Sequence, residues 1–457
     1  MVEHSLWERV AVGSNPIIPI GGFFMEDNKV FCIAPWVHMN VNCNGDVYPC
    51  CMLPILETEE HDDTDKMLDG DGFNRDNPLE YIAGECDGAP REFKMGSLIN
   101  QSMKEAWNSE EMKELRRNMI AGKKSSFCTT CYKEESVGAF SHRQGMNNNF
   151  RHHFKHVLET EEDGTFDRFN LVYWDFRLSN VCNFKCRMCG PGCSSAWESE
   201  MRKEFDIKDP YPKIDMDMVR DNIEPLYDIV EECYFAGGEP MIMDHHYEIL
   251  QELIKRGRTD VRIRYNTNFS TLTYKGINVL DLWEKFDDVN VMISIDGIGE
   301  RGELVRNGFD WKRFKDNYAK FRQRFPDKKL TVNYVVQALT VFHSMDAQKE
   351  LYRMGAIDSP DDFYCTLLHN PDFLSVCILD SETRKELGAK IKSHVKEFLV
   401  PTKSEDSINQ YISVLKLLAS EKRTDLIPNF KAYMKALDAL RGEDTLKTFP
   451  ELKRVLQ

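Results

Sequence analysis

The sequence predicts an α/β protein, with a small mixed region before a parallel sheet or barrel and a helical region after it. Three observations lead to this prediction. From residue 171 onward, short apolar strand-like runs alternate with helical periodicity. Residues 31–51 have the pattern of a hairpin, and residues 380–457 are charged with apolar side chains at helical spacing. At 457 residues, roughly 150 per domain suggests two or three domains, which we place at residues 1–150, 165–375 and 380–457.

Composition excludes several classes of protein. The formal charge of -16 argues against general binding to nucleic acid or to anionic membranes, which requires a basic face. We find no apolar run of about 18 residues, and residues 1–13 lack the layout of a signal peptide. We therefore expect a soluble, cytoplasmic protein without membrane contact. In such a chain, clustered thiols among the 14 cysteines favour metal ligation or catalysis over disulfides.

Polar motifs follow the predicted strands of the sheet region. A cysteine-rich loop follows the first strand, Gly-Gly-Glu-Pro the second, and Asn266-Thr-Asn268 and Asp296-Gly297 the next two. Parallel α/β barrels place their active sites at the carboxyl ends of strands, so we expect these motifs to share one site. The six strands are expected at residues 171–176, 233–236, 261–265, 289–295, 330–336 and 363–368.

The cysteine-rich loop has the spacing Cys182-x3-Cys186-x2-Cys189. A structural zinc site requires four protein ligands. Three thiolates on a cubane iron–sulfur cluster instead leave one iron free to bind another molecule. The loop therefore indicates reactive metal chemistry, although Cys193 remains a further possible ligand.

A second set of thiols lies earlier in the chain. The hairpin brings Cys32 and Cys50 together, and Cys128-x2-Cys131 follows a helical segment that is broken near Ser109. These four thiols can hold either a cluster or a zinc ion, and their spacing does not decide between them. Cys43 and Cys51 are spare candidates. The histidine-rich stretch at residues 151–156 is better explained as a solvated helical face than as a metal site.

The three sheet motifs together resemble the radical S-adenosylmethionine (radical SAM) superfamily. The pattern Cys182-x3-Cys186-x2-Cys189, Gly237-Gly-Glu-Pro240 and Ser294-Ile-Asp-Gly297 matches in order and spacing over roughly residues 170–370. The resemblance implies a partial (β/α)6 TIM-like barrel and a [4Fe-4S] cluster on Cys182, Cys186 and Cys189. The open iron would bind SAM, and one electron would cleave SAM to methionine and a 5'-deoxyadenosyl radical.

The same resemblance assigns the residues that contact SAM. Gly237 and Gly238 let the backbone approach the methionine ammonium, and Glu239 offers a charge-matched acceptor. Ser294 and Asp296 point to one side of a strand end, as needed to hold two ribose hydroxyls. Three further contacts follow from the resemblance: Asn268, Arg306 and, through its backbone near adenine, Met188.

The earlier thiols resemble the auxiliary-cluster module called SPASM, or its shorter form, twitch. The pattern is Cys32-x12-Gly45-x4-Cys50, a helical segment, and Cys128-x2-Cys131. No further cysteine lies between Cys131 and Cys182, so the resemblance implies one auxiliary [4Fe-4S] cluster, on Cys32, Cys50, Cys128 and Cys131. The module usually follows the barrel, and here it precedes it.

Three functions remain open from the sequence. The first is hydrogen abstraction from a peptide or protein, the reaction class of many enzymes with such modules. The second is oxidation or rearrangement of a small molecule such as a sugar or amino-alcohol, and the third is iron–sulfur binding without catalysis. An enzyme of this class would need an electron donor such as flavodoxin or ferredoxin. The sequence identifies neither the substrate nor a catalytic acid or base.

Overall fold

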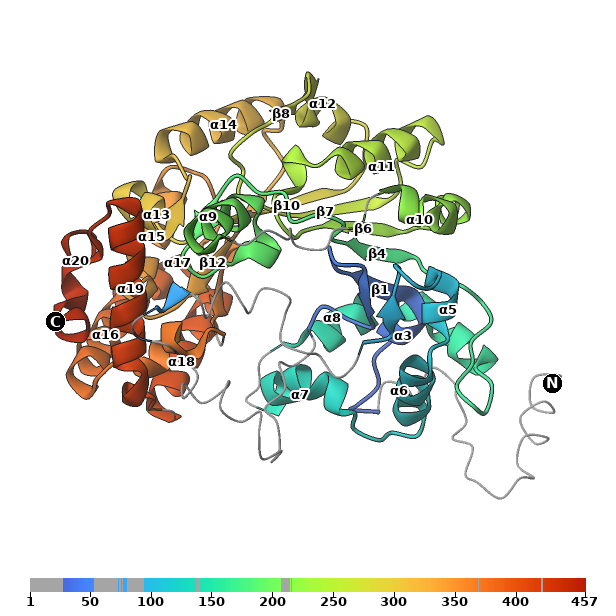
Figure 1. Ribbon diagram of the computed structural model, residues 1–457, viewed down its shortest axis with the longest axis horizontal. Helices are drawn as coiled ribbons and strands as arrows, with labels where there is room; N and C mark the ends of the chain where they lie inside the picture. Colours follow the sequence, from blue (N-terminus) through green and yellow to red (C-terminus); the bar gives the residue numbers. More distant parts are fainter. Residues whose placement is uncertain are drawn as a thin grey trace. The chain divides into compact units, whose positions relative to one another are not determined.

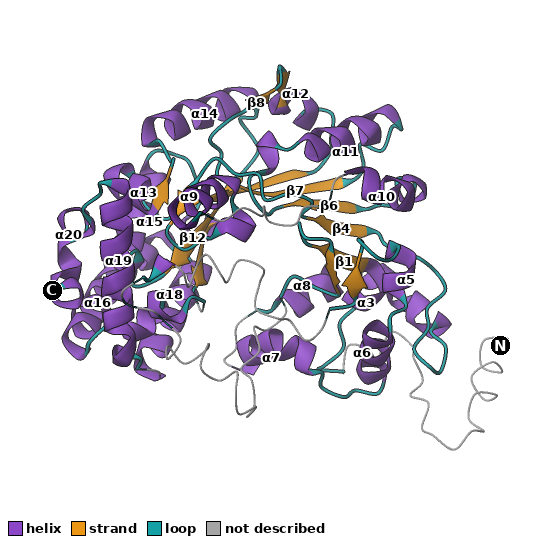
Figure 2. Ribbon diagram, in the orientation of Figure 1, coloured by secondary structure: helices purple, strands orange, loops and turns teal. Residues whose placement is uncertain are grey.

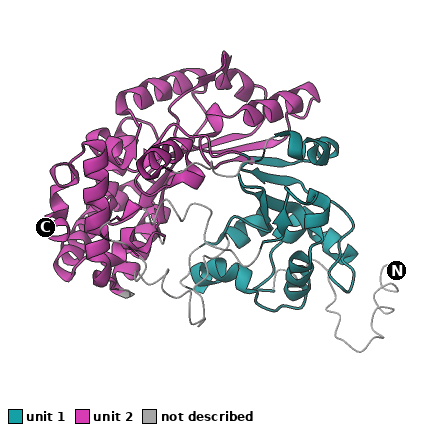
Figure 3. Ribbon diagram, in the orientation of Figure 1, with its two compact units in different colours: residues 1–56, 90–178, 213–233 teal, residues 57–89, 179–212, 234–457 magenta. Residues whose placement is uncertain are grey.

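The computed structural model describes residues 28–52, 73, 75, 77–79, 94–136, 140–206, 214, 216–368, 370–420 and 422–457. The chain forms two compact units, which Figure 3 distinguishes by colour. Unit 1 contains residues 1–56, 90–178 and 213–233, and unit 2 contains residues 57–89, 179–212 and 234–457. The domain boundaries expected at residues 150, 165 and 375 stay a prediction.

The hairpin predicted near the N-terminus is present in unit 1. Strands β1 (His38–Val41) and β2 (Asp46–Tyr48) pair antiparallel, and the turn between them contains Gly45 at a φ of 86°. Glycine adopts this left-handed conformation without steric cost. The short strand β3 (Gly96–Ser97), which was not predicted, pairs with β2.

Strand β1 also pairs in parallel with β4 (Tyr173–Phe176), the first of the six predicted strands. Strand order in unit 1 is therefore β4-β1-β2-β3. The first predicted barrel strand thus lies in the same compact unit as the N-terminal hairpin. No local sequence pattern reveals this pairing, because the two strands are separated by more than a hundred residues of chain.

Helices complete unit 1 (Figure 1). The predicted break near Ser109 is confirmed, since the Ser109 hydroxyl caps a new helix by accepting a hydrogen bond from the Met112 amide at 3.3 Å. Trp107 and Met112 on either side of this break are fully buried. The helices of unit 1 are α3 (Ala34–Val37), α5 (Met103–Trp107), α6 (Glu110–Ile120), α7 (Thr129–Ser136), α8 (His142–Asn149) and α10 (Met216–Ile223), with 3-10 helices η1 (Ser126–Cys128), η2 (Arg151–Glu159) and η4 (Glu224–Leu226).

The sheet of unit 2 is parallel. Strands β7, β10, β12 and β13 pair in this order, and each pair is parallel. Strand β6 carries the chain from unit 1 into unit 2. These strands occupy the predicted positions: β6 (Glu232–Phe235), β7 (Arg262–Thr267), β10 (Val289–Ser294), β12 (Leu330–Val336) and β13 (Phe363–Leu367).

Along the chain, helical segments follow strands β6, β7, β10 and β12. Figure 2 distinguishes these helices from the strands by colour. The alternation and the parallel pairing confirm the predicted α/β barrel class. The helical segments between the strands are η5 (Pro240–Ile242), α11 (Asp244–Lys255), α12 (Val279–Trp283), α13 (Gly299–Val305), α14 (Trp311–Arg324), α15 (Val341–Arg353) and η6 (Pro360–Asp362). Two short antiparallel ladders also occur: β5 (Lys185–Cys186) with β11 (Arg306–Asn307), and β8 (Thr273–Tyr274) with β9 (Ile277–Asn278).

The predicted helical C-terminal region is confirmed, and it belongs to the same compact unit as these strands. Tyr411, Phe430, Tyr433 and Leu437 are buried to within 1% of full burial. Among the described residues, no helix has both the length and the apolar character needed to cross a membrane. The principal helices of the C-terminal region are α16 (Ser381–His394), α18 (Glu405–Ser420), α19 (Ile427–Arg441), α20 (Thr445–Thr448) and α21 (Lys453–Leu456).

Candidate metal and cofactor sites

The three clustered cysteines lie in a loop of unit 2, residues 180–190, which we call the cysteine loop. The loop turns tightly, because the Cys189 amide donates to the Cys186 carbonyl at 3.0 Å. The Cys182 amide donates to the Ser195 hydroxyl at 3.2 Å, at the start of helix α9 (Ser195–Phe205). The Asn180 side-chain amide donates to the Pro191 carbonyl at 2.9 Å and so closes the loop. The protein's own hydrogen bonds therefore define this loop.

Burial keeps the three thiols of the loop protonated when no metal is bound. Burial and the neighbouring Cys186 raise the pKa of Cys182 to about 12. Burial also raises the pKa values of Cys186 and Cys189. The guanidinium of Arg306 acts in the opposite direction on all three thiols. A bound cation would replace the thiol protons, as expected of metal ligands.

The spacing of these sulfurs fits a cluster better than a single ion. Thiolates on one zinc ion lie ~3.8 Å apart, because each Zn–S bond is ~2.3 Å long and the geometry is tetrahedral. Within the part of the chain that the structure describes, the sulfurs of Cys182, Cys186 and Cys189 are not all within 4.8 Å of one another. Thiolates that bind different irons of one cluster are farther apart than thiolates on one ion, so the wider spacing fits a cluster.

The Gly-Gly-Glu-Pro turn packs directly against the cysteine loop. The Glu239 amide donates to the Val181 carbonyl at 2.7 Å. Gly238 has a φ of 43°, and a Cβ at this position would lie 2.4 Å from the Val181 carbonyl oxygen. Only glycine permits this close approach of the two backbones. The predicted need for glycine is thus met by the packing of two backbone segments.

The carboxylate of Glu239 holds the end of strand β7 in place. It is 1% exposed and accepts hydrogen bonds from the Met241 amide at 3.0 Å, the Thr267 hydroxyl at 2.7 Å and the Asn268 amide at 2.6 Å. Burial raises the pKa of Glu239, and these three donors lower it. A carboxylate has about four acceptor positions. One position therefore remains for a donor from a bound cofactor.

Asn268 connects strand β7 to the cysteine loop. Its side-chain amide donates to the Asn183 side-chain oxygen at 3.0 Å. The Asn183 amide group in turn donates to the Ser270 hydroxyl at 2.9 Å. The structure therefore brings Asn268 to the loop that carries Cys182, as the shared-site prediction requires.

Arg306 lies between the cysteine loop and the end of strand β10. Arg306 pairs with Cys186 in the antiparallel ladder of β11 and β5, and its guanidinium donates to the Cys186 sulfur at 3.7 Å. The same guanidinium forms a 2.7 Å ion pair with Asp296, whose other oxygen accepts a hydrogen bond from the Val335 amide at 2.7 Å. Burial raises the pKa of Asp296, and Arg306 lowers it. The Arg306 guanidinium therefore links Asp296 to the cysteine loop.

The remaining predicted SAM contacts are half-buried or lie in the same turn. Ser294 is the last residue of β10 and is half-buried, next to Asn333 of β12. Met188 lies within the cysteine loop and is half-buried. Gly237 precedes Gly238 and has a φ of 73°. Their roles toward SAM stay predictions.

The sequence did not reveal the residues that fix the back of the cysteine loop. Arg187 is fully buried and forms ion pairs with Asp438 at 2.6 Å and with Glu443 at 2.5 Å. The Tyr433 hydroxyl donates to the Arg187 carbonyl at 2.8 Å, and Arg441 donates to the Lys185 carbonyl at 3.0 Å. The partners lie about 250 residues away along the chain, so no local spacing could have identified them. The arginine between two cysteine ligands was the available signal.

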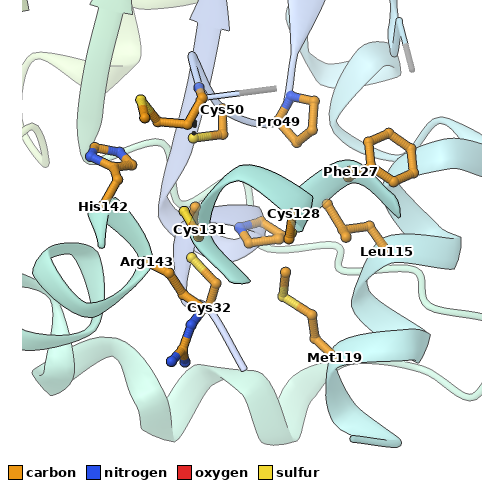
Figure 4. Close-up of a pocket in the computed structure, with 13 residues that line it drawn as sticks. Cys32, Pro49, Cys50, Leu115, Met119, Phe127, Cys128, Cys131, His142 and Arg143 are labelled. Atoms are coloured by element: carbon orange, nitrogen blue, oxygen red, sulfur yellow. Dashed lines mark hydrogen bonds between the residues drawn. The ribbon is translucent and has the colours of Figure 1, made fainter. Parts of the chain in front are cut away.

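Unit 1 contains the second set of thiols, around the pocket shown in Figure 4. All four predicted ligands, Cys32, Cys50, Cys128 and Cys131, line this pocket, which encloses about 420 Å³ including open solvent. Burial raises the pKa of Cys128 to about 12, with a further contribution from Cys131. Burial also raises the pKa of Cys32, to which Cys128 and Cys131 add. The structure therefore joins the hairpin cysteines to the Cys-x2-Cys pair, as predicted.

Three cysteines with no assigned role differ in their surroundings. Cys193 is exposed, beyond the cysteine loop, and Cys43 is half-buried in the hairpin turn. Cys51 lies beside Cys50 and His142, and the ligand atoms of these three residues are within 4.8 Å of one another. In the histidine-rich stretch, His152 and His153 bind the Glu231 carboxylate at 2.9 and 2.8 Å.

Two family models match the chain, and each covers one of these sites. The radical SAM superfamily model matches residues 176–338, and a model of an iron-sulfur cluster-binding domain, SPASM, matches residues 32–132. The chain therefore carries a region that matches the radical SAM superfamily and, before it, a SPASM-type iron-sulfur cluster-binding domain. Its cofactors are accordingly SAM and iron–sulfur clusters. The second match also decides between cluster and zinc for the thiols of unit 1, in favour of a cluster.

Solved structures show weaker likenesses. The matches include anSMEcpe with bound AdoMet, at 17% identity and a TM-score of 0.33, covering 49% of this chain and 60% of that one. They also include SuiB from Streptococcus suis bound to S-adenosylmethionine, at 14% identity and a TM-score of 0.33, covering 62% and 63%. The chain thus spans 60% of the length of anSMEcpe. Among curated proteins, no sequence matches it.

The residues of unit 2 fit a cluster with SAM. The thiols of buried Cys186 and half-buried Cys182 and Cys189 are spaced more widely than ligands of a single ion, and Glu239 retains an acceptor position. When bound, the cluster and SAM would supply one-electron cleavage of SAM. This chain's residues position the thiols through Arg187 and Asn180, and Arg306 compensates their negative charge.

Proposed function

We propose that this chain is an enzyme that cleaves SAM reductively and abstracts hydrogen from a peptide or protein substrate. The observation that carries the proposal is the cysteine loop, which offers three clustered thiols, one buried and two half-buried, beside a turn with a free acceptor position on Glu239. Three thiolates bind three of the four irons of a cubane. The fourth iron would then be available to SAM.

The SPASM-type module supports the choice of a peptide. Residues 32–132 match an iron-sulfur cluster-binding domain, and radical SAM enzymes with such modules commonly modify peptides. We propose that the auxiliary cluster on Cys32, Cys50, Cys128 and Cys131 holds substrate or accepts an electron. A reduced flavodoxin or ferredoxin would supply the electron that cleaves SAM.

We propose three roles for residues of unit 2 toward SAM. Glu239 accepts a hydrogen bond from the methionine ammonium at its remaining acceptor position. Ser294 binds a ribose hydroxyl at the end of β10. Asp296, whose carboxylate is engaged by Arg306 and the Val335 amide, has about two acceptor positions left and binds the second ribose hydroxyl with one of them.

The test is deuterium transfer under anaerobic conditions. Reconstituted protein receives dithionite, SAM and deuterated candidates, in one set short peptides encoded beside its gene and in another set sugars and amino-alcohols. Deuterium in 5'-deoxyadenosine from a peptide is the expected result. Transfer only from a small molecule would replace the peptide proposal, and no 5'-deoxyadenosine from protein with full iron content would indicate a non-catalytic binding protein.

A further inference from the structure

A group of three metal-binding side chains in unit 1 has no role in the function proposed above. Cys50, Cys51 and His142 place their ligand atoms within 4.8 Å of one another. Two sulfurs and one nitrogen on a single tetrahedral zinc ion would lie ~3.5–3.8 Å apart, since Zn–S bonds are ~2.3 Å and Zn–N bonds ~2.0 Å. The group is therefore sized for one ion, unlike the more widely spaced thiols of the cysteine loop.

The group lies at one side of the auxiliary pocket. In Figure 4, His142 and Cys50 are neighbours, whereas Cys32, Cys128 and Cys131 gather on another side. Cys50 and His142 belong both to the pocket and to the group, and Cys50 is also one of the four predicted cluster ligands.

The protein holds His142 firmly in position. His142 is the first residue of helix α8, and Ser141 and Gln144 form a capping box around it. The next residue, Arg143, forms an ion pair with Glu135 at 2.7 Å and donates to the Phe31 carbonyl at 2.7 Å. The imidazole is thus carried on a fixed turn, as a metal ligand needs to be.

The Nε2 atom of His142 has no hydrogen-bond partner, although it is buried. Buried polar atoms are generally partnered, so each exception calls for an explanation. The other compact group of the described residues differs in this respect. There the Nε2 atoms of His152 and His153 already bind the Glu231 carboxylate. Only the Cys50 group combines a free imidazole nitrogen with two thiols.

We propose that Cys50, Cys51 and His142 bind one divalent ion of the zinc type beside the auxiliary cluster, with the Cys50 sulfur shared between the ion and the cluster. Two cysteines and one histidine leave a fourth tetrahedral position open, a set known from catalytic zinc sites. A thiolate or carboxylate of a substrate fits that position. The proposal goes beyond the proposed function, because it does not depend on which substrate is used.

The test uses zinc itself as the probe. Anaerobically reconstituted protein with both clusters is dialysed against Zn²⁺, its iron and zinc are measured, and its zinc K-edge absorption is recorded. We expect about one zinc per chain with two sulfur ligands and one imidazole. His142→Ala and Cys51→Ala should each weaken zinc binding at least tenfold while iron content is unchanged. Cys43→Ala is the matched control and should bind zinc like the wild type.

His142→Cys guards against misfolding of the alanine variant. It should restore zinc binding, with three sulfurs in the absorption spectrum. The shared Cys50 predicts that zinc alters the electron paramagnetic resonance signal of the reduced auxiliary cluster. Zinc bound equally by His142→Ala and the wild type would overturn the proposal, as would zinc bound only by protein that has lost iron.

Discussion

The two thiol sites of this chain differ in how the protein organises them. In unit 2, the ligands lie within eight residues, and Arg187, Asn180 and Arg306 satisfy or neutralise the groups around them. In unit 1, the proposed ligands come from segments up to about a hundred residues apart. The comparison indicates that contacts around one loop order the first site, whereas the second is assembled from distant segments of the chain.

The largest expected effect is the loss of the SAM-binding cluster. Cys186→Ala should abolish formation of 5'-deoxyadenosine, because Cys186 is one of the three proposed ligands and its sulfur accepts a hydrogen bond from Arg306. Iron should fall from about eight to about four per chain, at four per cubane cluster. Iron and sulfide analysis of reconstituted protein, with a SAM cleavage assay, measures both. Retention of about eight irons would mean that Cys186 is not a ligand.

Replacing Arg187 tests whether protein contacts order the cysteine loop. Arg187→Ala would leave Asp438 and Glu443 facing each other without their cation, and loss of one partner of a buried ion pair costs about 3–5 kcal/mol. Urea unfolding should show this loss, with lower iron retention by the cysteine loop. Arg324→Ala is the control, since it removes only exposed ion pairs, with Glu284 and Asp281, and should cost about 0–1 kcal/mol. Equal effects of the two variants would contradict the role of Arg187 in fixing the cysteine loop.

The charge of Arg306 should tune the cluster of unit 2. Arg306→Gln removes a buried cation beside Cys186, so the reduced cluster, which carries one more negative charge, loses stabilisation. We expect the reduction potential to fall by about 60 mV or more, equivalent to 1.4 kcal/mol for one electron. Spectroelectrochemical titration measures the potential of each cluster separately. An unchanged reduction potential of the unit 2 cluster would refute this role of Arg306. An equal fall in the potential of the unit 1 cluster would also refute it.

A smaller effect is expected at His38 of unit 1. Burial lowers the pKa of His38 from 6.5 to about 4, so the folded state holds the imidazole neutral. Its contribution to stability is complete above pH 6.5 and is lost as the pH falls toward 4. One pH unit within this window costs up to about 1.4 kcal/mol. The hydrogen-exchange protection factors of residues 38–41, which correct for the slower intrinsic exchange at lower pH, should fall between pH 6.5 and 5.5, and the fall should be smaller in His38→Gln.

The sequence predicted the parts of this protein that depend on short-range patterns. All six strands, the hairpin and the helix break at Ser109 lie where periodicity and turn residues placed them. The cysteine loop and the Gly-Gly-Glu-Pro turn were recognisable because their spacing is local. Gly238 shows the limit of such patterns, since the backbone contact with Val181 that requires glycine there is visible only in the structure.

The sequence could not predict contacts that only the folded chain creates. The ion pairs of Arg187 join residues about 250 positions apart, and the pairing of β1 with β4 joins the hairpin to the first barrel strand. His142 was not a candidate ligand either, because a single histidine at a helix start has no distinguishing pattern. Its position beside Cys50 and Cys51 depends on how α8 packs within unit 1.

The division of work between the two sites is tested most directly by the double variant Cys128→Ala and Cys131→Ala. The variant must first show native-like circular dichroism, because loss of a structural metal can unfold its domain. It should then still form 5'-deoxyadenosine with dithionite, since the cysteine loop of unit 2 is intact, but it should form no product from the true substrate. A folded variant that turns over substrate at the wild-type rate would contradict the role of the auxiliary cluster.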